Sequence, residues 1–175
     1  MKKILVVIDM QNDFISGALG NDQCLACVPE VVSHIKDESY DQIFLTRDTH
    51  FEDYMDTMEG QKLPVPHCIK GSQGWQLIPE VTEAIQGRKY QIVDKPTFGS
   101  TELGALLGAE YNTEEIEIDF VGVCTGICVI SNSMIAKANC PNAVIRVFSK
   151  ACACVTPDTH QTALDAMKLC HIDIV

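Results

Sequence analysis

The sequence predicts an α/β protein in which helices cover both faces of a parallel sheet. Short runs rich in valine and isoleucine alternate along the chain with longer amphipathic stretches. The short runs are apolar almost throughout, as expected for strands whose two faces are both covered. Strands that alternate with helices favour right-handed crossovers, and therefore parallel pairing.

The first strand begins almost at once, because the apolar run from Ile4 to Ile8 ends in Asp9. Strands are predicted over residues 3–9, 42–46, 91–94, 116–121, 143–148 and 172–175. Helices are predicted over residues 28–37, 101–107, 126–138 and 157–169. The last helix has the clearest start, since Pro157 suits a first helical position and Thr156 suits an N-cap.

A chain of 175 residues is the usual size of one domain, so a single domain over residues 1–175 is expected. One segment, residues 48–75, does not follow the strand–helix alternation. It is long and polar and contains three glycines, two prolines and two of the five histidines. Irregular segments of this length in a compact domain usually carry function.

The formal net charge is −11, with 24 acidic residues against 13 lysines and arginines. An acidic surface repels phosphate backbones and anionic lipids, which argues against nucleic acid and membranes as partners. The first apolar run is too short for a signal peptide, and no run approaches the length of a membrane span. A cytoplasmic protein is therefore expected.

The nine cysteines are odd in number and accompany no secretion signal, so most are expected to be reduced and buried. Cys24 and Cys27 form a CxxC pair. No second pair stands at zinc-finger spacing, which argues against a metal or redox role for this pair.

Sites in open parallel sheets form at the carboxyl ends of the strands. Asp9 ends the first predicted strand, and Lys95 follows the third. Burial of Asp9 is expected to raise its pKa toward that of a general base. Each has a simpler alternative role: Asp9 could bond to the turn that follows it, and Lys95 could be a surface lysine with a buried stem.

Cys128 lies at the start of the third predicted helix, after two glycines. A helix N-terminus lowers the pKa of a thiol, and its amides can stabilise an oxyanion, so Cys128 is the candidate nucleophile. The alternative is a buried structural cysteine. Cys124 is the rival nucleophile, but it falls in the preceding turn.

Asp48 and His50 lie two residues apart, so they project to one side of an extended chain. His67 follows in the same irregular segment, with Glu59 between them. One carboxylate and two histidines can hold a divalent metal with open coordination positions.

Together these segments resemble the isochorismatase-like cysteine hydrolases, and among them the nicotinamidases, over essentially the whole chain. The signature at residues 6–14 reads VVIDMQNDF, and the most specific match, at residues 122–129, reads GVCTGICV. Residues 46–50 (TRDTH) and 66–74 (PHCIKGSQG) are similar to the metal-binding segments of nicotinamidases, and the match continues to TPDTH at residues 156–160.

The resemblance implies a three-layer α/β/α fold whose six-stranded parallel sheet has the order 3-2-1-4-5-6, with a cis peptide between Val123 and Cys124. It implies hydrolysis of nicotinamide to nicotinate and ammonia through a thioester on Cys128, an activity of NAD salvage. The resemblance implies a catalytic triad of Asp9, Lys95 and Cys128, and an oxyanion hole formed by the amides of Cys124 and Cys128. It implies a substrate pocket lined by Phe14 and Phe98. The implied metal ligands are Asp48, His50 and His67.

The implied cofactor is a divalent metal ion, with zinc favoured over iron or manganese, and family members are commonly homo-oligomers. Two features depart from the family pattern. Pro64 stands where metal-binding nicotinamidases often have an aromatic residue, and the segment has no further histidine, which leaves Glu59 as the candidate fourth ligand.

Three alternatives remain open at this point. The chain could hydrolyse another small amide or a carbamoyl compound on the same framework. It could be a binding or carrier-associated domain without cysteine chemistry. It could also be a cysteine-rich metal or redox protein. Metal content separates the first from a nicotinamidase, and thiol labelling separates the last from an enzyme with one reactive cysteine.

Overall fold

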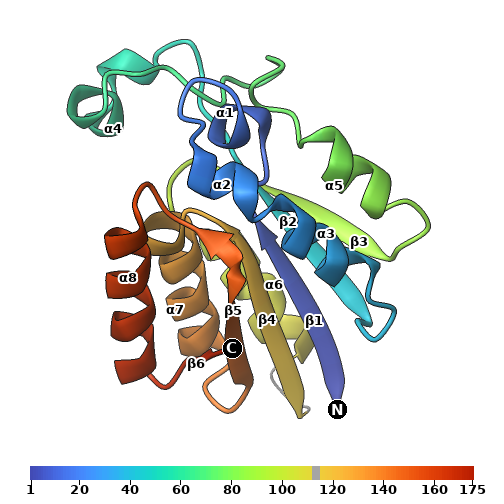
Figure 1. Ribbon diagram of the computed structural model, residues 1–175. Helices are drawn as coiled ribbons and strands as arrows, with labels where there is room; N and C mark the ends of the chain where they lie inside the picture. Colours follow the sequence, from blue (N-terminus) through green and yellow to red (C-terminus); the bar gives the residue numbers. More distant parts are fainter. Residues whose placement is uncertain (112–114) are drawn as a thin grey trace.

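A computed structural model of the chain describes residues 1–111 and 115–175. Within these ranges the strands form one parallel sheet of order β3-β2-β1-β4-β5-β6, which confirms the expected three-layer α/β fold (Figure 1). The strands are β1 (Lys2–Ile8), β2 (Gln42–Asp48), β3 (Tyr90–Lys95), β4 (Ile116–Val123), β5 (Val144–Ala153) and β6 (Asp173–Ile174).

Helices cover both faces of this sheet (Figure 1). One face carries α6 (Thr101–Tyr111), α7 (Ile130–Asn139) and α8 (Pro157–Leu169). The other carries α2 (Asp22–Ala26), α3 (Val28–Lys36) and α5 (Pro79–Ala84). The short helix α1 (Asn12–Ile15) follows β1, and no described helix is both long and apolar enough to cross a bilayer.

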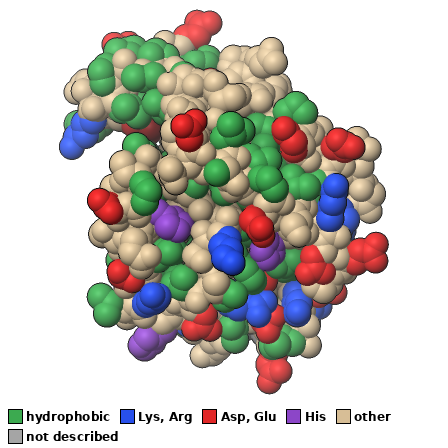
Figure 2. Space-filling model, in the orientation of Figure 1, with side chains coloured by type: hydrophobic (Ala, Val, Ile, Leu, Met, Phe, Trp, Pro, Cys, Tyr) green, Lys and Arg blue, Asp and Glu red, His purple; other side chains and the backbone are tan. Residues whose placement is uncertain are grey.

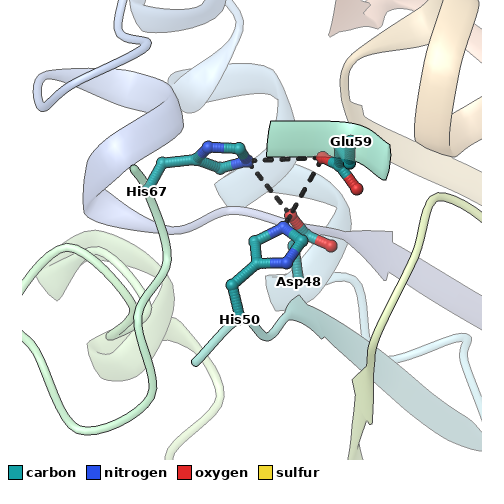
Figure 3. Close-up of side chains that lie close together, drawn as sticks. All are labelled: Asp48, His50, Glu59 and His67. Carbon is teal, nitrogen blue, oxygen red and sulfur yellow. Dashed lines mark hydrogen bonds and ion pairs between the residues drawn. The ribbon is translucent and has the colours of Figure 1, made fainter. Parts of the chain in front are cut away.

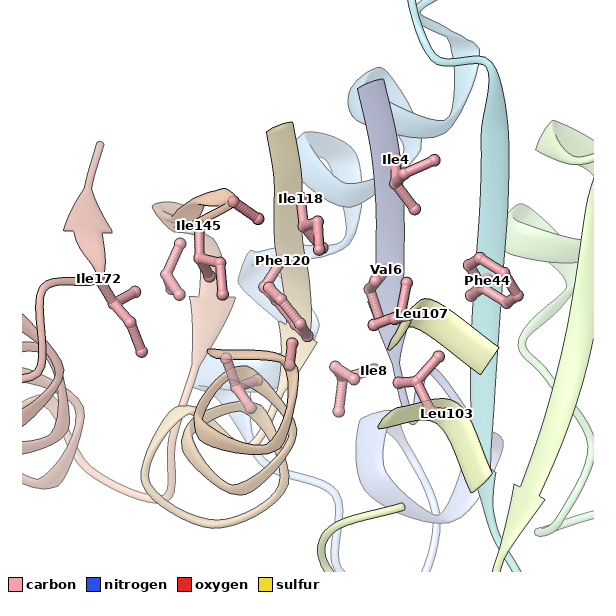
Figure 4. Packing of buried hydrophobic residues seen from close by; sticks show 14 of the residues in the cluster. Ile4, Val6, Ile8, Phe44, Leu103, Leu107, Ile118, Phe120, Ile145 and Ile172 are labelled. Atoms are coloured by element: carbon pink, nitrogen blue, oxygen red, sulfur yellow. The ribbon is translucent and has the colours of Figure 1, made fainter. Parts of the chain in front are cut away.

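The strands divide the core into two clusters, because successive side chains point to opposite faces. In β1, Ile4, Val6 and Ile8 belong to the cluster under α6 and α7 (Figure 4). Leu5 and Val7 belong to the cluster on the other face, under α3. All five are fully buried. This two-sided burial explains why the strands read as continuous apolar runs.

Two elements extend well beyond their predicted ends, whereas β2, β3 and β4 continue by only one or two residues. The helix predicted over 101–107 continues to Tyr111, because Leu103, Leu107 and Tyr111 keep one apolar stripe despite the intervening Gly108. The strand predicted over 143–148 continues to Ala153. The polar pair at Ser149 and Lys150 suggests a strand end, but residues 151–153 are buried and pair again with β4 beyond a shift in register.

The irregular segment after β2 holds two short helices, η1 (Tyr54–Asp56) and α4 (Met58–Lys62). It projects beyond the carboxyl edge of the sheet (Figure 1). Thr57 caps α4 by accepting a hydrogen bond from the Gly60 amide at 3.0 Å. Figure 2 shows hydrophobic side chains gathered on this projecting part, where Met55 and Met58 are exposed.

Candidate active site

The carboxyl ends of four neighbouring strands, β3, β2, β1 and β4, bring the predicted catalytic and metal-binding side chains to one edge of the sheet. Asp9 follows β1, and Asp48 and Lys95 are the paired last residues of β2 and β3. Cys128 lies in the turn that follows β4. Parallel pairing aligns these ends, so residues far apart in sequence become neighbours.

Lys95 and Asp9 form a fully buried ion pair. The Lys95 Nζ lies 2.7 Å from Asp9 Oδ2 and 3.3 Å from Asp48 Oδ1, and both Lys95 and Asp9 have no exposed surface. Burial alone would lower the pKa of Lys95, but the carboxylates of Asp9 and Asp48 raise it. Lys95 is thus a charged interior residue and not a surface lysine.

Asp9 keeps a raised pKa despite this cation, because the cost of burying its charge is the largest influence on it. Its Oδ1 accepts a hydrogen bond of 2.6 Å from the Thr46 hydroxyl. Among the described residues, its Oδ2 accepts no well-directed hydrogen bond, although it faces the Lys95 ammonium. Oδ2 is therefore the oxygen that remains able to take up a proton.

Cys128 lies beside this pair, with its Sγ 3.6 Å from Lys95 Nζ. It belongs to a π-helical turn, η2 (Thr125–Val129), and not to the first turn of an α-helix over 126–138 as predicted. The expectation of a lowered pKa is also wrong. The thiol is 5 % exposed, and burial together with the charge of Asp9 raises its pKa well above the ordinary value.

Two buried polar residues that the sequence analysis did not single out hold these groups in place. Thr46 binds Asp9 twice, since its hydroxyl also accepts a bond of 3.2 Å from the Asp9 amide. Gln11 holds the main chain of Asp48 through bonds of 2.7 and 2.8 Å and also donates to the Trp75 carbonyl. Their signal in the sequence is a polar residue inside or beside an apolar strand.

The four predicted metal ligands converge on one point. The ligand atoms of Asp48, His50, Glu59 and His67 all lie within 4.8 Å of one another (Figure 3). Asp48 Oδ2 lies 2.9 Å from His50 Nε2 and 3.4 Å from His67 Nε2. Glu59 Oε1 lies 3.6 and 3.8 Å from the same two nitrogens.

The surroundings of the two His67 ring nitrogens show that this group of donors suits a cation. Its Nδ1 lies 2.8 Å from the Val65 carbonyl, which can only accept a hydrogen bond. A neutral His67 therefore turns an unprotonated Nε2 toward Asp48, and two acceptors 3.4 Å apart need a proton or a cation between them. Burial alone would lower the pKa of His67, but Asp48 and Glu59 raise it, as expected where positive charge is favoured.

A cavity of about 410 Å³ joins the thiol to the metal-ligand group. Its lining includes Cys128 and Cys124 together with Asp48, Glu59 and His67. Phe14 and Phe98 also line it. Leu63, next to Pro64, contributes an apolar wall. A cavity of this size with a largely apolar lining and a few polar groups suits a small ligand with a polar substituent.

All nine cysteines are free. Cys24 and Cys27 are both buried in and beside α2, where the Cys27 thiol donates to the Cys24 carbonyl at 3.2 Å. Burial raises the pKa of Cys27 to about 12. The Val123–Cys124 peptide bond is cis, as the resemblance implies.

Comparison with known proteins identifies the family. A model of the isochorismatase domain family matches residues 3–175. The chain belongs to the isochorismatase family. Among its curated relatives, the nicotinamidase/pyrazinamidase of Mycobacterium tuberculosis is 24% identical over an alignment of 191 positions. The alignment covers 99% of this chain and 98% of the relative. The nicotinamidase of Saccharomyces cerevisiae is 26% identical over 178 residues, which cover 77% of this chain and 81% of the relative.

Solved structures of the isochorismatase family share the whole fold. A nicotinamidase/pyrazinamidase from Bacillus subtilis superposes with a TM-score of 0.86 at 24% identity and covers 100% of both chains. A pyrazinamidase of Pyrococcus horikoshii, solved in complex with zinc, gives a TM-score of 0.78 at 24% identity and covers 100% of this chain and 99% of its own. These likenesses confirm the sheet order and the three layers.

Proposed function

We propose that the chain is a nicotinamidase that converts nicotinamide and water to nicotinate and ammonia through a thioester on Cys128. The observation that carries the proposal is a single buried ammonium between a carboxylate and a thiol. Lys95 Nζ lies 2.7 Å from Asp9 Oδ2 and 3.6 Å from Cys128 Sγ, at the wall of a ligand-sized cavity. The curated relatives named nicotinamidase support the choice of substrate.

In the first step Asp9 takes the proton of Cys128, and the thiolate attacks the carboxamide carbon. The raised pKa of Asp9 makes it a competent base, and the raised pKa of Cys128 keeps the thiol protonated until substrate is bound. Lys95 stabilises the thiolate as it forms. The amides of Cys124 and Cys128 receive the charge that develops on the carbonyl oxygen.

In the second step the carbon–nitrogen bond breaks. Asp9 returns its proton to the departing nitrogen, ammonia leaves, and the acyl group stays on Cys128 as a thioester. Asp9, again a carboxylate, then takes a proton from water, whose oxygen attacks the thioester carbon. The sulfur leaves as a thiolate beside Lys95, recovers the proton from Asp9, and nicotinate is released.

Asp48, His50 and His67, with Glu59 as the fourth candidate, would hold a divalent metal ion, for which zinc suits the mixture of nitrogen and oxygen donors. Bound there, such an ion would supply a Lewis acid for the ring nitrogen of the substrate. Phe14 and Phe98 would flank the ring. In a site of this kind, holding the amide carbon in line with the thiol supplies much of the rate enhancement over the uncatalysed reaction.

The direct test is ammonia release from nicotinamide, pyrazinamide and a panel of small amides, with and without a chelator. Cys128→Ala should lower turnover by about 10⁴-fold or more, because the thioester forms on the sulfur that this change removes. Cys140→Ala, which removes another buried thiol, is the matched control and should keep near wild-type activity.

Ammonia release by Cys128→Ala at the wild-type rate would contradict the proposed nucleophile. Hydrolysis of another amide but not of nicotinamide would support the amidase chemistry and contradict nicotinamide as the substrate. A chelator that removes all bound metal without reducing substrate affinity would contradict the role of the metal.

A further inference from the structure

Asn132 lies one helical turn after Cys128 and has no assigned role. It is 1 % exposed, and its carboxamide makes three hydrogen bonds to main-chain groups. Its Oδ1 accepts from the Ser100 amide at 2.9 Å. Its Nδ2 donates to the Phe98 carbonyl at 3.0 Å and to the Cys128 carbonyl at 2.8 Å. One side chain thus connects the residue that carries the thiol to the loop that carries Phe98.

The helix around Cys128 is irregular. Val129 donates to the Cys124 carbonyl at 3.1 Å, which is a π-helical bond, before α7 begins at Ile130. Two side chains bond to carbonyls of this turn: the Ser131 hydroxyl to that of Ile127 at 2.6 Å, and Asn132 to that of Cys128. Such turns are frequent at functional sites, and side-chain bonds to carbonyls four residues back fix their geometry.

The loop that Asn132 holds, residues 96–100, joins β3 to α6. It begins directly after Lys95, whose ammonium donates to the Thr97 carbonyl at 3.1 Å. It ends at Ser100, whose hydroxyl accepts from the Leu103 amide and so begins α6. A Cβ at Gly99 would lie 2.6 Å from Ile135 Cδ1, so the loop packs directly on α7.

Phe98 is held by its main chain more than by packing of its ring. Its side chain lines the cavity, yet 42 % of the residue is exposed. An exposed ring loses little energy when its loop shifts, so its position depends on the bonds to the loop backbone. Asn132 makes two of those bonds, to Phe98 and to Ser100.

We propose that Asn132 is a positioning residue that sets the spacing between Phe98 and Cys128, and thereby the preference of the site for flat aromatic carboxamides. The inference rests on the proposed function, since it gives Phe98 the role of a wall for the substrate ring. Asn132 touches no substrate and acts through Phe98. Its loss should therefore weaken binding of an aromatic amide more than it slows the chemical step.

The first test is a double-mutant cycle with nicotinamide as substrate. Asn132→Ala is expected to raise KM by about tenfold with a smaller change in kcat, because a displaced Phe98 no longer makes its aromatic contact with the substrate ring. Phe98→Ala should raise KM similarly. The KM of the double variant should equal that of Phe98→Ala within about twofold, because both changes remove the same interaction, that of the Phe98 ring with the substrate.

Asn139→Ala is the matched control. Asn139 lies on the same helix and donates the same kind of bond, to the Ile135 carbonyl at 2.9 Å, but it contacts α6 and not the loop. It should leave KM unchanged. If Asn132→Ala fails to fold, Asn132→Asp carries the test, because it keeps the shape and the acceptor for Ser100 but loses the amide donors. The proposal would be overturned if the increase of KM in the double variant equalled the product of the two single increases. It would also be overturned if neither Asn132 variant changed KM.

A second test needs no turnover. The rate at which iodoacetamide alkylates Cys128 is compared with the rate for N-phenyl-iodoacetamide, followed by mass spectrometry of the Cys128 peptide. The wild type should prefer the aromatic reagent, and Asn132→Ala and Phe98→Ala should lose that preference to the same extent, whereas Asn139→Ala keeps it. A preference retained in Asn132→Ala but lost in Phe98→Ala would overturn the proposal. If no amide is hydrolysed, the proposed function fails while this ratio still tests Asn132.

Discussion

Lys95 is a cation without exposed surface that meets two carboxylates, a thiol and a carbonyl. Moving an ammonium into the interior costs several kcal/mol, and opposite charges at hydrogen-bond distance recover this cost only in good geometry. Removal of one partner from such a pair typically costs about 3–5 kcal/mol, because a buried charge stays behind. Asp9 and Lys95 are therefore stable only as a pair.

Glu59 provides the prediction at this scale. Burial and the charge of Asp48 raise its pKa, so its carboxylate is destabilised when no cation is bound. Glu59→Gln should weaken zinc affinity by about tenfold or more. It should leave the metal-free protein at least as stable as the wild type, because it removes a repulsive charge. Competition with a chelator and thermal melts without metal measure the two effects.

Glu52→Gln is the control, since Glu52 is an exposed carboxylate in the same segment. It should change neither quantity. Equal zinc affinity in Glu59→Gln and Glu52→Gln would exclude Glu59 as a ligand and leave Asp48, His50 and His67 as the set.

The carboxyl end of β4 is the element on which the proposed nucleophile depends. Gly122 pairs with Ile8 of β1 and has φ of 114°, at the point where the register with β5 shifts. A Cβ there would lie 2.2 Å from the Ile8 carbonyl oxygen, which belongs to the strand that leads to Asp9. The close approach of β1 and β4 at this point aligns Asp9 with the turn that carries Cys128.

Gly122→Ala should therefore lower the free energy of unfolding by more than about 3 kcal/mol, because it combines a left-handed backbone with a clash against a rigid strand. Gly87→Ala is the matched control. Gly87 also has positive φ, 77°, but a Cβ there would meet nothing within 4 Å, so the cost should be about 1 kcal/mol. Urea unfolding measures both, and equal costs would contradict the close-approach argument.

At the scale of the whole molecule, the protein carries a net charge of −11 and encloses many neutral thiols. Figure 2 shows acidic and basic side chains interspersed over the face in view. The thiols lie beneath this surface, where burial raises the pKa of Cys27, Cys68, Cys128 and Cys152. Stability should therefore depend on pH in the alkaline range.

Cys27 shows the sign of this dependence. Its pKa is about 12 in the folded chain, whereas an unfolded thiol ionises near pH 8.5. Below the pKa of the unfolded thiol, Cys27 is protonated in both states, so its contribution to the free energy of unfolding is fully present. Between these values the unfolded state binds fewer protons, so stability falls by about 1.4 kcal/mol per pH unit for this thiol. Cys27→Ala should make the decline between pH 9 and 10.5 less steep by that amount.

Val28→Ala, at the adjacent buried residue, is the control because it removes apolar volume but no titratable group. It should shift the urea midpoint equally at every pH. If the free energy of unfolding of Cys27→Ala fell with pH in parallel with that of the wild type, the raised pKa of Cys27 would be contradicted.

Sequence patterns could predict the class of fold and the place of the candidate site, because both follow from local chemistry. Continuous apolar runs predict covered strands, and charged residues at strand ends predict where a site can form. They could not predict Asn132 or Thr46 as partners, since a buried amide or hydroxyl looks the same in sequence whether it binds a neighbour or a distant loop. The end of β5 was missed because the polar pair Ser149 and Lys150 interrupts the apolar run, and only the sheet shows that residues 152–153 pair again with β4.

The sequence by itself determined the alternation of strands and helices, the family resemblance, and the residue types gathered at the carboxyl edge. The tertiary structure alone decided how those residues act on one another. The pKa of Cys128 is the clearest case. Its place after two glycines suggested a stabilised thiolate, but the pKa is raised because the folded chain excludes water and sets Asp9 beside the sulfur. Burial and distance are properties of the packed chain, and no local pattern encodes them.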